Sequence, residues 1–225
     1  MKPLLKATIL CLLMAFLTRP LKAQDQDYVI TIKGDTVKCK IKKQFLGGLR
    51  YKNGKMMGAV DISSENIRGY FLHKDNTSWQ SVINEEDKHE VADSTKHEFM
   101  EVLEKGKICL FQEIWSETYG NIGYNYQRNL SSSGTNWYVS TGSDTVTQIK
   151  TNAGWLAKSR KDRKKYVAAL FSDNQAVYNK FIAGDDFSFD QLRNLIHLYN
   201  TGQPYKKPEG EKESPINPVN KSRFH

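Results

Sequence analysis

The hydrophobic periodicity of the chain changes near Gly154, and this change constrains the fold more than any other feature. Before it, apolar residues alternate with polar ones in short runs separated by turn residues, which is typical of half-buried antiparallel strands. After it, apolar residues recur every three to four positions, as on one face of a helix. We therefore predict an α+β fold, with an antiparallel β-rich domain, barrel-like or sandwich-like, over residues 24–155. A short three-helix C-terminal piece follows over residues 156–202.

The clearest alternation surrounds Gly34-Asp35, which is a typical two-residue hairpin turn. Tyr28–Lys33 precedes the turn and Thr36–Lys43 follows it, so a half-buried hairpin is predicted. The second strand places apolar and basic residues on opposite faces: Val37, Cys39 and Ile41 on one, Lys38, Lys40 and Lys42 on the other. The lysine face could bind an acidic partner, but a solvated or guarded sheet edge is the simpler interpretation.

Other short runs predict further strands, at Leu49–Asn53, Lys55–Val60, Arg68–His73, Trp79–Ile83, Glu98–Leu103, Lys107–Trp115, Trp137–Thr141 and Thr145–Lys150. Two segments are predicted as loops. Asn84–Lys96 is polar and charged, and Gly120–Gly134 is rich in Gly, Asn, Ser and Tyr.

Three helices are predicted after the change in periodicity. The first covers Arg160–Phe171, and the second ends at Gly184. Capping-box spacing occurs twice, at Ser172 with Gln175 and at Ser188 with Gln191. The third helix has a strong apolar face, formed by Phe189, Leu192, Leu195, Ile196 and Tyr199, and Phe187 with Leu192 has the spacing of a hydrophobic staple. Such short helices are not stable alone, so they should dock on the sheet or on each other.

Residues 1–23 have the three-part layout of a secretory signal peptide. Lys2 and Lys6 precede the apolar run Ala7–Leu17, and the small residue Ala23 marks the expected cleavage point. The run is too short to cross a bilayer, which needs about 20 residues. We expect an exported mature protein that starts at Gln24 and resides in the periplasm or at the outer membrane or cell surface. An uncleaved anchor is the alternative.

The net charge of +8 comes mainly from the two ends of the chain. The leader carries four cations and no acid, and residues 203–225 carry a further excess of Lys and Arg. The charge left for the folded part is small, so we expect no nucleic-acid partner. Residues 203–225 contain few apolar groups and are predicted to form a disordered tail.

No stretch of the sequence indicates a reaction. There is no Gly-x-Ser-x-Gly motif, and Cys109 falls within a predicted strand, where thiols are usually inert. Carboxylate pairs for glycoside cleavage could be drawn from Glu98, Glu101, Glu113 and Glu117, but any strand-rich chain offers such pairs. We expect a protein that is not an enzyme, with a small hydrolase acting on envelope polymers as the alternative.

Metal and cofactor sites are not predicted either. His89 and His97 flank an acidic segment without a helical or strand register, and His197 is expected to be a surface or half-buried residue. The mature chain has two cysteines, Cys39 and Cys109, which we expect to be free thiols, with a disulfide as the alternative.

Two features are candidate contact surfaces. Aromatic residues gather around the Gly/Asn/Ser-rich segment, and Tyr124, Tyr126 and Trp137 are the predicted binding residues, because exposed aromatics can stack on sugars or fill a pocket of a partner. A basic run could contact an anionic membrane surface through Lys158, Arg160, Lys161, Arg163, Lys164 and Lys165. The expected partner is an envelope protein or glycan.

Several short segments of the sequence resemble a large set of exported Bacteroidota proteins of unassigned function. These segments are the opening from Asp27 to Lys38 (DYVITIKGDTVK), Ile67–Phe71 (IRGYF), Phe99–Leu110 (FMEVLEKGKICL) and the ending Phe189–Asn200. In some of those proteins a similar region precedes an outer-membrane β-barrel. This chain departs from them after Asn200, where nothing is expected to form barrel strands, and it has Cys39 where the usual word has Gly. The resemblance implies an exported envelope protein and supplies no catalytic residues.

Overall fold

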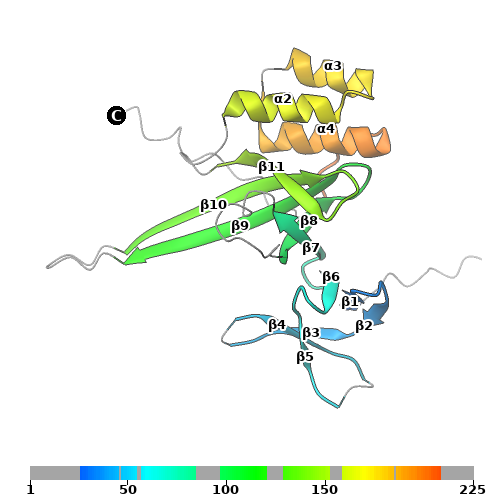
Figure 1. Ribbon diagram of the computed structural model, residues 1–225, viewed down its shortest axis with the longest axis vertical. Coiled ribbons are helices and arrows are strands. Elements are labelled where there is room, and N and C mark those ends of the chain that lie inside the picture. Colours follow the sequence, from blue (N-terminus) through cyan, green and yellow to red (C-terminus); the bar gives the residue numbers. More distant parts are fainter. Residues whose placement is uncertain are drawn as a thin grey trace, which may run out of the picture.

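The computed structural model describes residues 26–45, 47–54, 57–84, 97–120, 129–152, 159–184 and 186–208. It confirms the predicted α+β layout, in which antiparallel-rich sheets are followed by three helices (Figure 1). The strands are β1 (Tyr28–Thr31), β2 (Thr36–Lys38), β3 (Lys40–Lys43), β4 (Leu49–Lys52), β5 (Val60–Asp61), β6 (Ile67–Leu72), β7 (Thr77–Asn84), β8 (His97–Glu104), β9 (Cys109–Gly120), β10 (Asn129–Ser140) and β11 (Thr145–Thr151). The helices are α2 (Arg160–Leu170), α3 (Gln175–Ala183) and α4 (Phe189–Thr201).

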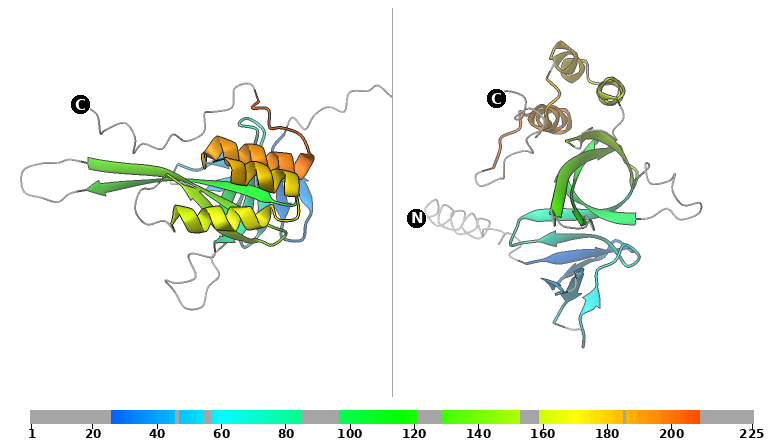
Figure 2. Two further views of the ribbon diagram at one scale, coloured as in Figure 1. Left: turned by 90° about the horizontal axis from the view of Figure 1, so that it is seen from above. Right: turned by 90° about the vertical axis from the view of Figure 1, so that its left-hand side faces the viewer.

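Strands β7 to β11 form a closed barrel. Neighbours along the chain pair antiparallel, and β11 also pairs with β7 through Thr145 with Ile83 and Val146 with Asn84. This closing pair is parallel, because an odd number of strands in up-and-down order brings the first and last strands together in the same direction. The right-hand view of Figure 2 shows the ring of strands. The side chains that fill it are Val82, Met100, Phe111, Tyr138 and Val146.

The three helices cover the outer face of the barrel on the side of β9, β10 and β11 (Figure 1). The largest apolar cluster lies between these layers and includes Leu110, Trp137, Val139 and Ile149 from the strands and Val167, Phe171, Phe181, Leu192, Leu195 and Ile196 from the helices. The predicted apolar face of the last helix is confirmed: four of its five residues are buried, and Tyr199 packs beside them. The three helices, which are too short to be stable alone, are thus stabilised by packing against the sheet.

A side chain from the residue just before each helix caps its N-terminus. The Ser188 hydroxyl accepts from the Gln191 amide at 3.2 Å, as predicted for α4. The α3 prediction is wrong in detail, since Asn174 and not Ser172 is the N-cap, with its side chain accepting from the Val177 amide. Asn174 directly precedes the helix, so its oxygen reaches the amide of Val177, whereas Ser172 lies two residues too early for this contact.

The segment after α4 starts in contact with the fold. The backbone amide of Tyr205 donates to the Asn194 side chain at 3.1 Å, and the Arg193 guanidinium lies 4.4 Å from the centre of the Tyr205 ring. Residues 203–208 were expected to belong to a disordered tail, and these contacts correct that expectation for Tyr205. Residues 209–225 lie outside the described part of the chain.

The N-terminal half extends the sheet through β6, β1 and β2 and adds a separate three-stranded sheet, β3-β4-β5. A single strand over residues 36–43 was expected, but the chain leaves one sheet and enters the other at Cys39. The backbone amide of Cys39 donates to the carbonyl of Asp27 at 3.0 Å. The two carboxylate oxygens of Asp27 accept from the amides of Ile41 and His73, each at 2.9 Å. Asp27 therefore fixes the crossover by binding it at Cys39 and Ile41 and by joining it to His73, after β6.

Strands β9 and β10 correct the prediction of a long loop at Gly120–Gly134. They pair in register from Cys109 with Ser140 out to Gly120 with Asn129. Strand β8 pairs with β9 only as far as Gln112, and β11 pairs with β10 only as far as Asn136, so the outer part is a two-stranded ribbon that projects from the barrel (Figure 1). A Cβ at Gly134 would lie 2.4 Å from the ring of Trp115, which explains a glycine in this strand.

Among the described residues, no helix is both long enough and apolar enough to cross a bilayer.

Candidate functional site

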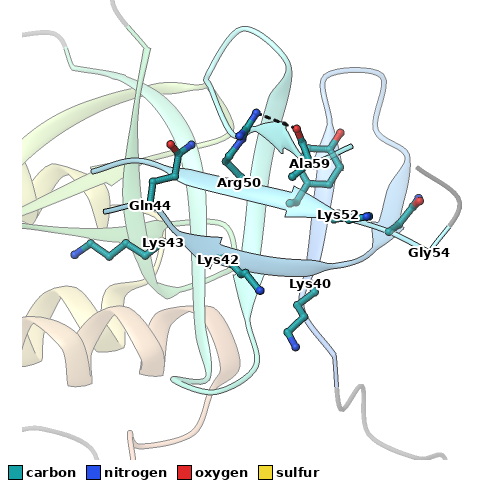
Figure 3. A pocket seen from close by; sticks show the side chains of 10 residues that line it. Lys40, Lys42, Lys43, Gln44, Arg50, Lys52, Gly54 and Ala59 are labelled. Atoms are coloured by element: carbon teal, nitrogen blue, oxygen red, sulfur yellow. Dashed lines mark hydrogen bonds between the residues drawn. The ribbon is translucent and has the colours of Figure 1, made fainter. Parts of the chain in front are cut away.

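A shallow hollow of about 440 Å³ lies on the small β3-β4-β5 sheet (Figure 3). The residues that line it are Lys40, Lys42, Lys43, Gln44, Arg50, Tyr51, Lys52, Asn53, Gly54 and Ala59. Five of them are cations, and none of these described residues carries a carboxylate. The lysine-bearing strand was noticed in the sequence, where a solvated face was the preferred interpretation. The structure adds a second basic strand beside it. We call this set of residues the basic hollow.

The strand register places cations directly opposite each other. Lys40 faces Lys52 and Lys42 faces Arg50 across the antiparallel pair β3-β4. Like charges directly opposite each other in a sheet are destabilising. All four side chains are exposed, because their neighbours Ile41, Leu49 and Tyr51 turn toward the core around Val29, Cys39, Ile67 and Tyr70.

One carboxylate offsets this charge only in part. Asp61 on β5 lies 2.9 Å from Nε of Arg50 and also accepts from the side-chain amide of Gln44 at 2.8 Å. Arg50 in turn donates to the Ala59 carbonyl at 3.1 Å. No described carboxylate forms an ion pair with Lys40, Lys42 or Lys52. The face therefore holds a fixed arginine and three lysines whose ammonium groups are available to an anion.

A second hollow, of about 340 Å³, lies beside the β8–β9 and β10–β11 turns and has a different character. Its lining includes Arg68, Lys107 and Asp144, and Arg68 lies 3.5 Å from Asp144. Lys107 forms an ion pair with Asp173, and hydrogen bonds from Lys107 and then Tyr199 lower the pKa of Asp173. Charges of both signs are paired here, so this hollow selects for an anion far less than the basic hollow does.

The predicted aromatic binding residues are not brought together on a described surface. Tyr124 and Tyr126 lie outside the described residues. Trp137 is a core side chain, 1% exposed, with its ring 4.7 Å from that of Phe189 and its Nε1 donating to Gln112 at 3.0 Å. The expectation that Trp137 faces a partner is therefore wrong, because its side chain lies in the apolar cluster between the barrel and the helices.

The predicted basic run forms the first turns of α2, with Lys158 outside the described residues. Lys161 and Lys165 are exposed. Arg160, Arg163 and Lys164 each interact with other groups of the protein. Helix α2 packs against β11, and burial, followed by the charges of Arg163 and Arg160, lowers the pKa of Lys150 on that strand. A contact of this helix with a membrane stays a prediction.

The candidate catalytic carboxylates that are described have structural partners. Glu113 accepts from the Tyr138 hydroxyl at 2.9 Å and from the Asn136 amide at 3.0 Å, and burial together with Glu113 raises the pKa of Tyr138. Glu101 accepts from Gln112 at 3.3 Å. The side chain of Glu117 lies outside the described residues, and Glu98, half-buried on β8, interacts with other groups of the protein.

The histidines give one hydroxyl–imidazole pair. Nδ1 of His97 lies 3.4 Å from Oγ of Ser81, but Ser81 is 5% exposed and sits in the middle of β7, whereas a nucleophile needs an accessible position. His197 is half-buried as expected, with Nδ1 2.9 Å from Glu104. His89 lies outside the described residues. Within the described ranges no three His, Cys, Asp or Glu side chains gather as metal ligands would.

Both described cysteines are free thiols, so the expectation of free cysteines is confirmed. Cys39 is buried and Cys109 is partly exposed. Burial, and then the charge of Asp27, raises the pKa of Cys39 to about 11, which makes this thiol a poor nucleophile.

The comparisons with known proteins match the chain to no family model, no curated protein and no solved structure.

Proposed function

We propose that this chain is an exported, non-enzymatic binding module that holds an anionic component of the cell envelope in the basic hollow. The observation that carries the proposal is the two pairs of facing cations on β3 and β4, Lys40 with Lys52 and Lys42 with Arg50, in a hollow with no carboxylate among its described lining residues.

The energetics favour a ligand over plain solvation. Four cations at adjacent positions repel one another, and only Arg50 has a described carboxylate partner. An anion that bridges two facing cations would replace this repulsion with attraction, and charge-assisted hydrogen bonds to ammonium and guanidinium groups are the strong ones. The arrangement of cations thus costs stability in the free protein and contributes favourable energy only when an anion is bound.

Other features support the proposal of export to the cell envelope. The leader at residues 1–23 has the layout of a signal peptide, and the resemblance to exported Bacteroidota proteins points the same way. An anionic envelope protein or glycan satisfies both the compartment and the charge of the hollow.

The alternative of a small hydrolase has weaker support. It would rely on Ser81 and His97, whose side chains lie 3.4 Å apart on neighbouring strands. Catalysis of this kind also needs a group that orients the imidazole and a place for the substrate. The burial of Ser81 leaves no such place, so we favour the binding module.

Titration of the mature chain with short-chain polyphosphate tests the proposal. We expect saturable binding by calorimetry that weakens as salt is added, because the attraction is screened. The variant Lys40→Gln/Lys52→Gln should lose at least tenfold in affinity. The variant Lys206→Gln/Lys207→Gln removes the same charge from two exposed residues after α4 and should bind as the unmodified chain does.

Equal loss in both variants would show that net charge and not the hollow attracts the anion, and would overturn the proposal. Absence of binding would overturn it as well.

A further inference from the structure

We infer that the anionic component is a membrane surface, on which the small sheet lies with the basic hollow toward the lipid headgroups. This inference rests on the proposed function and names the partner class. It depends on two fully exposed apolar side chains at the ends of the same sheet.

Phe45 is the first of these side chains, with an exposed fraction of 102%. It lies in the turn between β3 and β4, where the Gln44 amide donates to the Gly48 carbonyl at 3.1 Å and the Gly47 amide donates to the Gln44 carbonyl at 3.3 Å. Positive φ at Gly47 and Gly48 makes this tight turn possible. The turn is therefore hydrogen-bonded, and it holds the Phe45 ring out into solvent.

Met57 is the second, with an exposed fraction of 104%, and it lies in the connection from β4 to β5. The two residues therefore flank β4 at its opposite ends. Lys42 and Lys43 directly precede the turn that carries Phe45, and Lys52 precedes the connection that carries Met57. A basic surface bordered by exposed apolar side chains is the composition of interfacial membrane anchors, in which apolar groups insert while cations attract anionic lipids.

The arrangement of the cations also favours a surface over a compact soluble anion. In Figure 3 the side chains of Lys40, Lys42 and Lys43 are spread along the strand, and Lys43 extends in a different direction from Lys40 and Lys42. They do not converge on one point, as ligands of a single phosphate would. A layer of headgroups offers many anions side by side and matches this spread, and it also accounts for Phe45 and Met57, which a soluble polyanion would leave exposed.

The fold separates this surface from the other candidate for membrane contact. Helix α2, with Lys161 and Lys165, lies at the opposite end of the molecule from β3-β4-β5 (Figure 1). The two basic regions cannot rest flat on one membrane together, so binding experiments can distinguish them.

Co-sedimentation of the mature chain with vesicles tests the inference. We expect binding to vesicles of phosphatidylcholine mixed with phosphatidylglycerol and little binding to phosphatidylcholine alone. Because each cation near an anionic surface contributes on the order of fivefold in affinity, Lys40→Gln/Lys52→Gln should reduce vesicle binding more than tenfold. Phe45→Ser/Met57→Ser should also reduce it severalfold, while leaving polyphosphate binding unchanged.

The control variants match these changes elsewhere. Ile114→Ser alters an apolar side chain that is 69% exposed on β9, and Lys161→Gln/Lys165→Gln alters the exposed cations of α2. Both should bind vesicles like the unmodified chain. A loss confined to the α2 variant would overturn the inference and assign the contact to that helix.

The remaining outcomes separate the inference from the proposed function. Polyphosphate binding without vesicle binding, or vesicle binding that is indifferent to Phe45 and Met57, would overturn the membrane inference and leave a soluble acidic glycan or protein as the partner. Absence of both kinds of binding would overturn the two proposals together.

Discussion

The two ends of this molecule differ in how far they bury their apolar residues and separate their charges. At the helical end, strands β9 to β11 and helices α2 to α4 enclose one large cluster of buried apolar side chains. At the other end, the β3-β4-β5 sheet buries only one face, leaves Phe45 and Met57 fully exposed, and places like charges opposite each other. The first arrangement is what stability requires, whereas the second costs stability. We interpret the helix-backed barrel as a scaffold and the small sheet as the surface that it presents.

The largest expected effect tests the scaffold. Trp137→Ala removes a buried ring that contacts Phe189 and a hydrogen bond to Gln112. We expect a loss of about 3–5 kcal/mol in the free energy of unfolding, measured by chemical denaturation. Phe45→Ala is the control, and it should change stability by less than about 0.5 kcal/mol because the ring is exposed. Similar losses of stability in the two variants would contradict the distinction between a stabilising scaffold and an exposed surface.

The next effect concerns the crossover between the two sheets. Asp27→Ala removes the acceptor of the Ile41 and His73 amides, and hydrogen bonds to charged groups contribute about 1.5–3 kcal/mol each. We expect a loss of about 3 kcal/mol, the lower end for two such bonds, with faster amide hydrogen exchange in residues 28–72 and unchanged exchange in the barrel core.

The turn residue Asp35 provides the control, since its side chain is exposed and Asp35→Ala should leave exchange unaltered. Uniform acceleration of exchange throughout the chain in Asp27→Ala would show that the two ends unfold as one unit.

A smaller effect is expected at the start of α4. Ser188→Ala deletes the N-cap acceptor of the Gln191 amide and should cost about 1 kcal/mol in a thermal or chemical unfolding curve. Ser188→Thr keeps the hydroxyl, which accepts from Gln191 and donates to Asp186, and should recover most of this loss. If the two variants are equally destabilised, the capping hydrogen bond is not what fixes the end of the helix.

The smallest effect should have the opposite sign. Lys42→Gln removes one of the charges facing Arg50, so stability should rise by about 0.2–0.5 kcal/mol at low salt. The gain should disappear at high salt, where the repulsion is screened. Lys74→Gln, in the exposed turn after β6, should give no gain. A destabilised Lys42→Gln would mean that the cations support the sheet and are not held for a ligand.

The sequence predicted the scaffold better than the surface, for a physical reason. Alternation and 3.6-residue periodicity report burial, so most strands and all three helices lie close to their predicted places. The segment Gly120–Gly134 was predicted as a loop because Gly, Ser and Asn are poor strand formers. Its strands exist because β9 and β10 continue their register beyond the barrel, and propensity does not encode such continuation.

The candidate site shows the same limit. The lysines of β3 were visible in the sequence, and Arg50 and Lys52 alternate with Leu49 and Tyr51 after Gly47-Gly48. What the sequence could not provide was the pairing of Lys40 with Lys52, because strand register depends on the turn and on the packing of the opposite face. Trp137 was assigned to a surface because it belongs to the aromatic residues that gather around the Gly/Asn/Ser-rich segment, and only the docked helices reveal that its face of β10 is buried.

The most direct test of the account is to map the bound anion by NMR. Two-dimensional spectra of the labelled mature chain are recorded during titration with short-chain polyphosphate. We predict that shifted amide signals are confined to the small sheet and its turns, residues 40–61, while the barrel and α2 to α4 keep their positions. Shifts centred on α2, or on the hollow beside Arg68 and Asp144, would contradict the assignment of the small sheet as the binding surface.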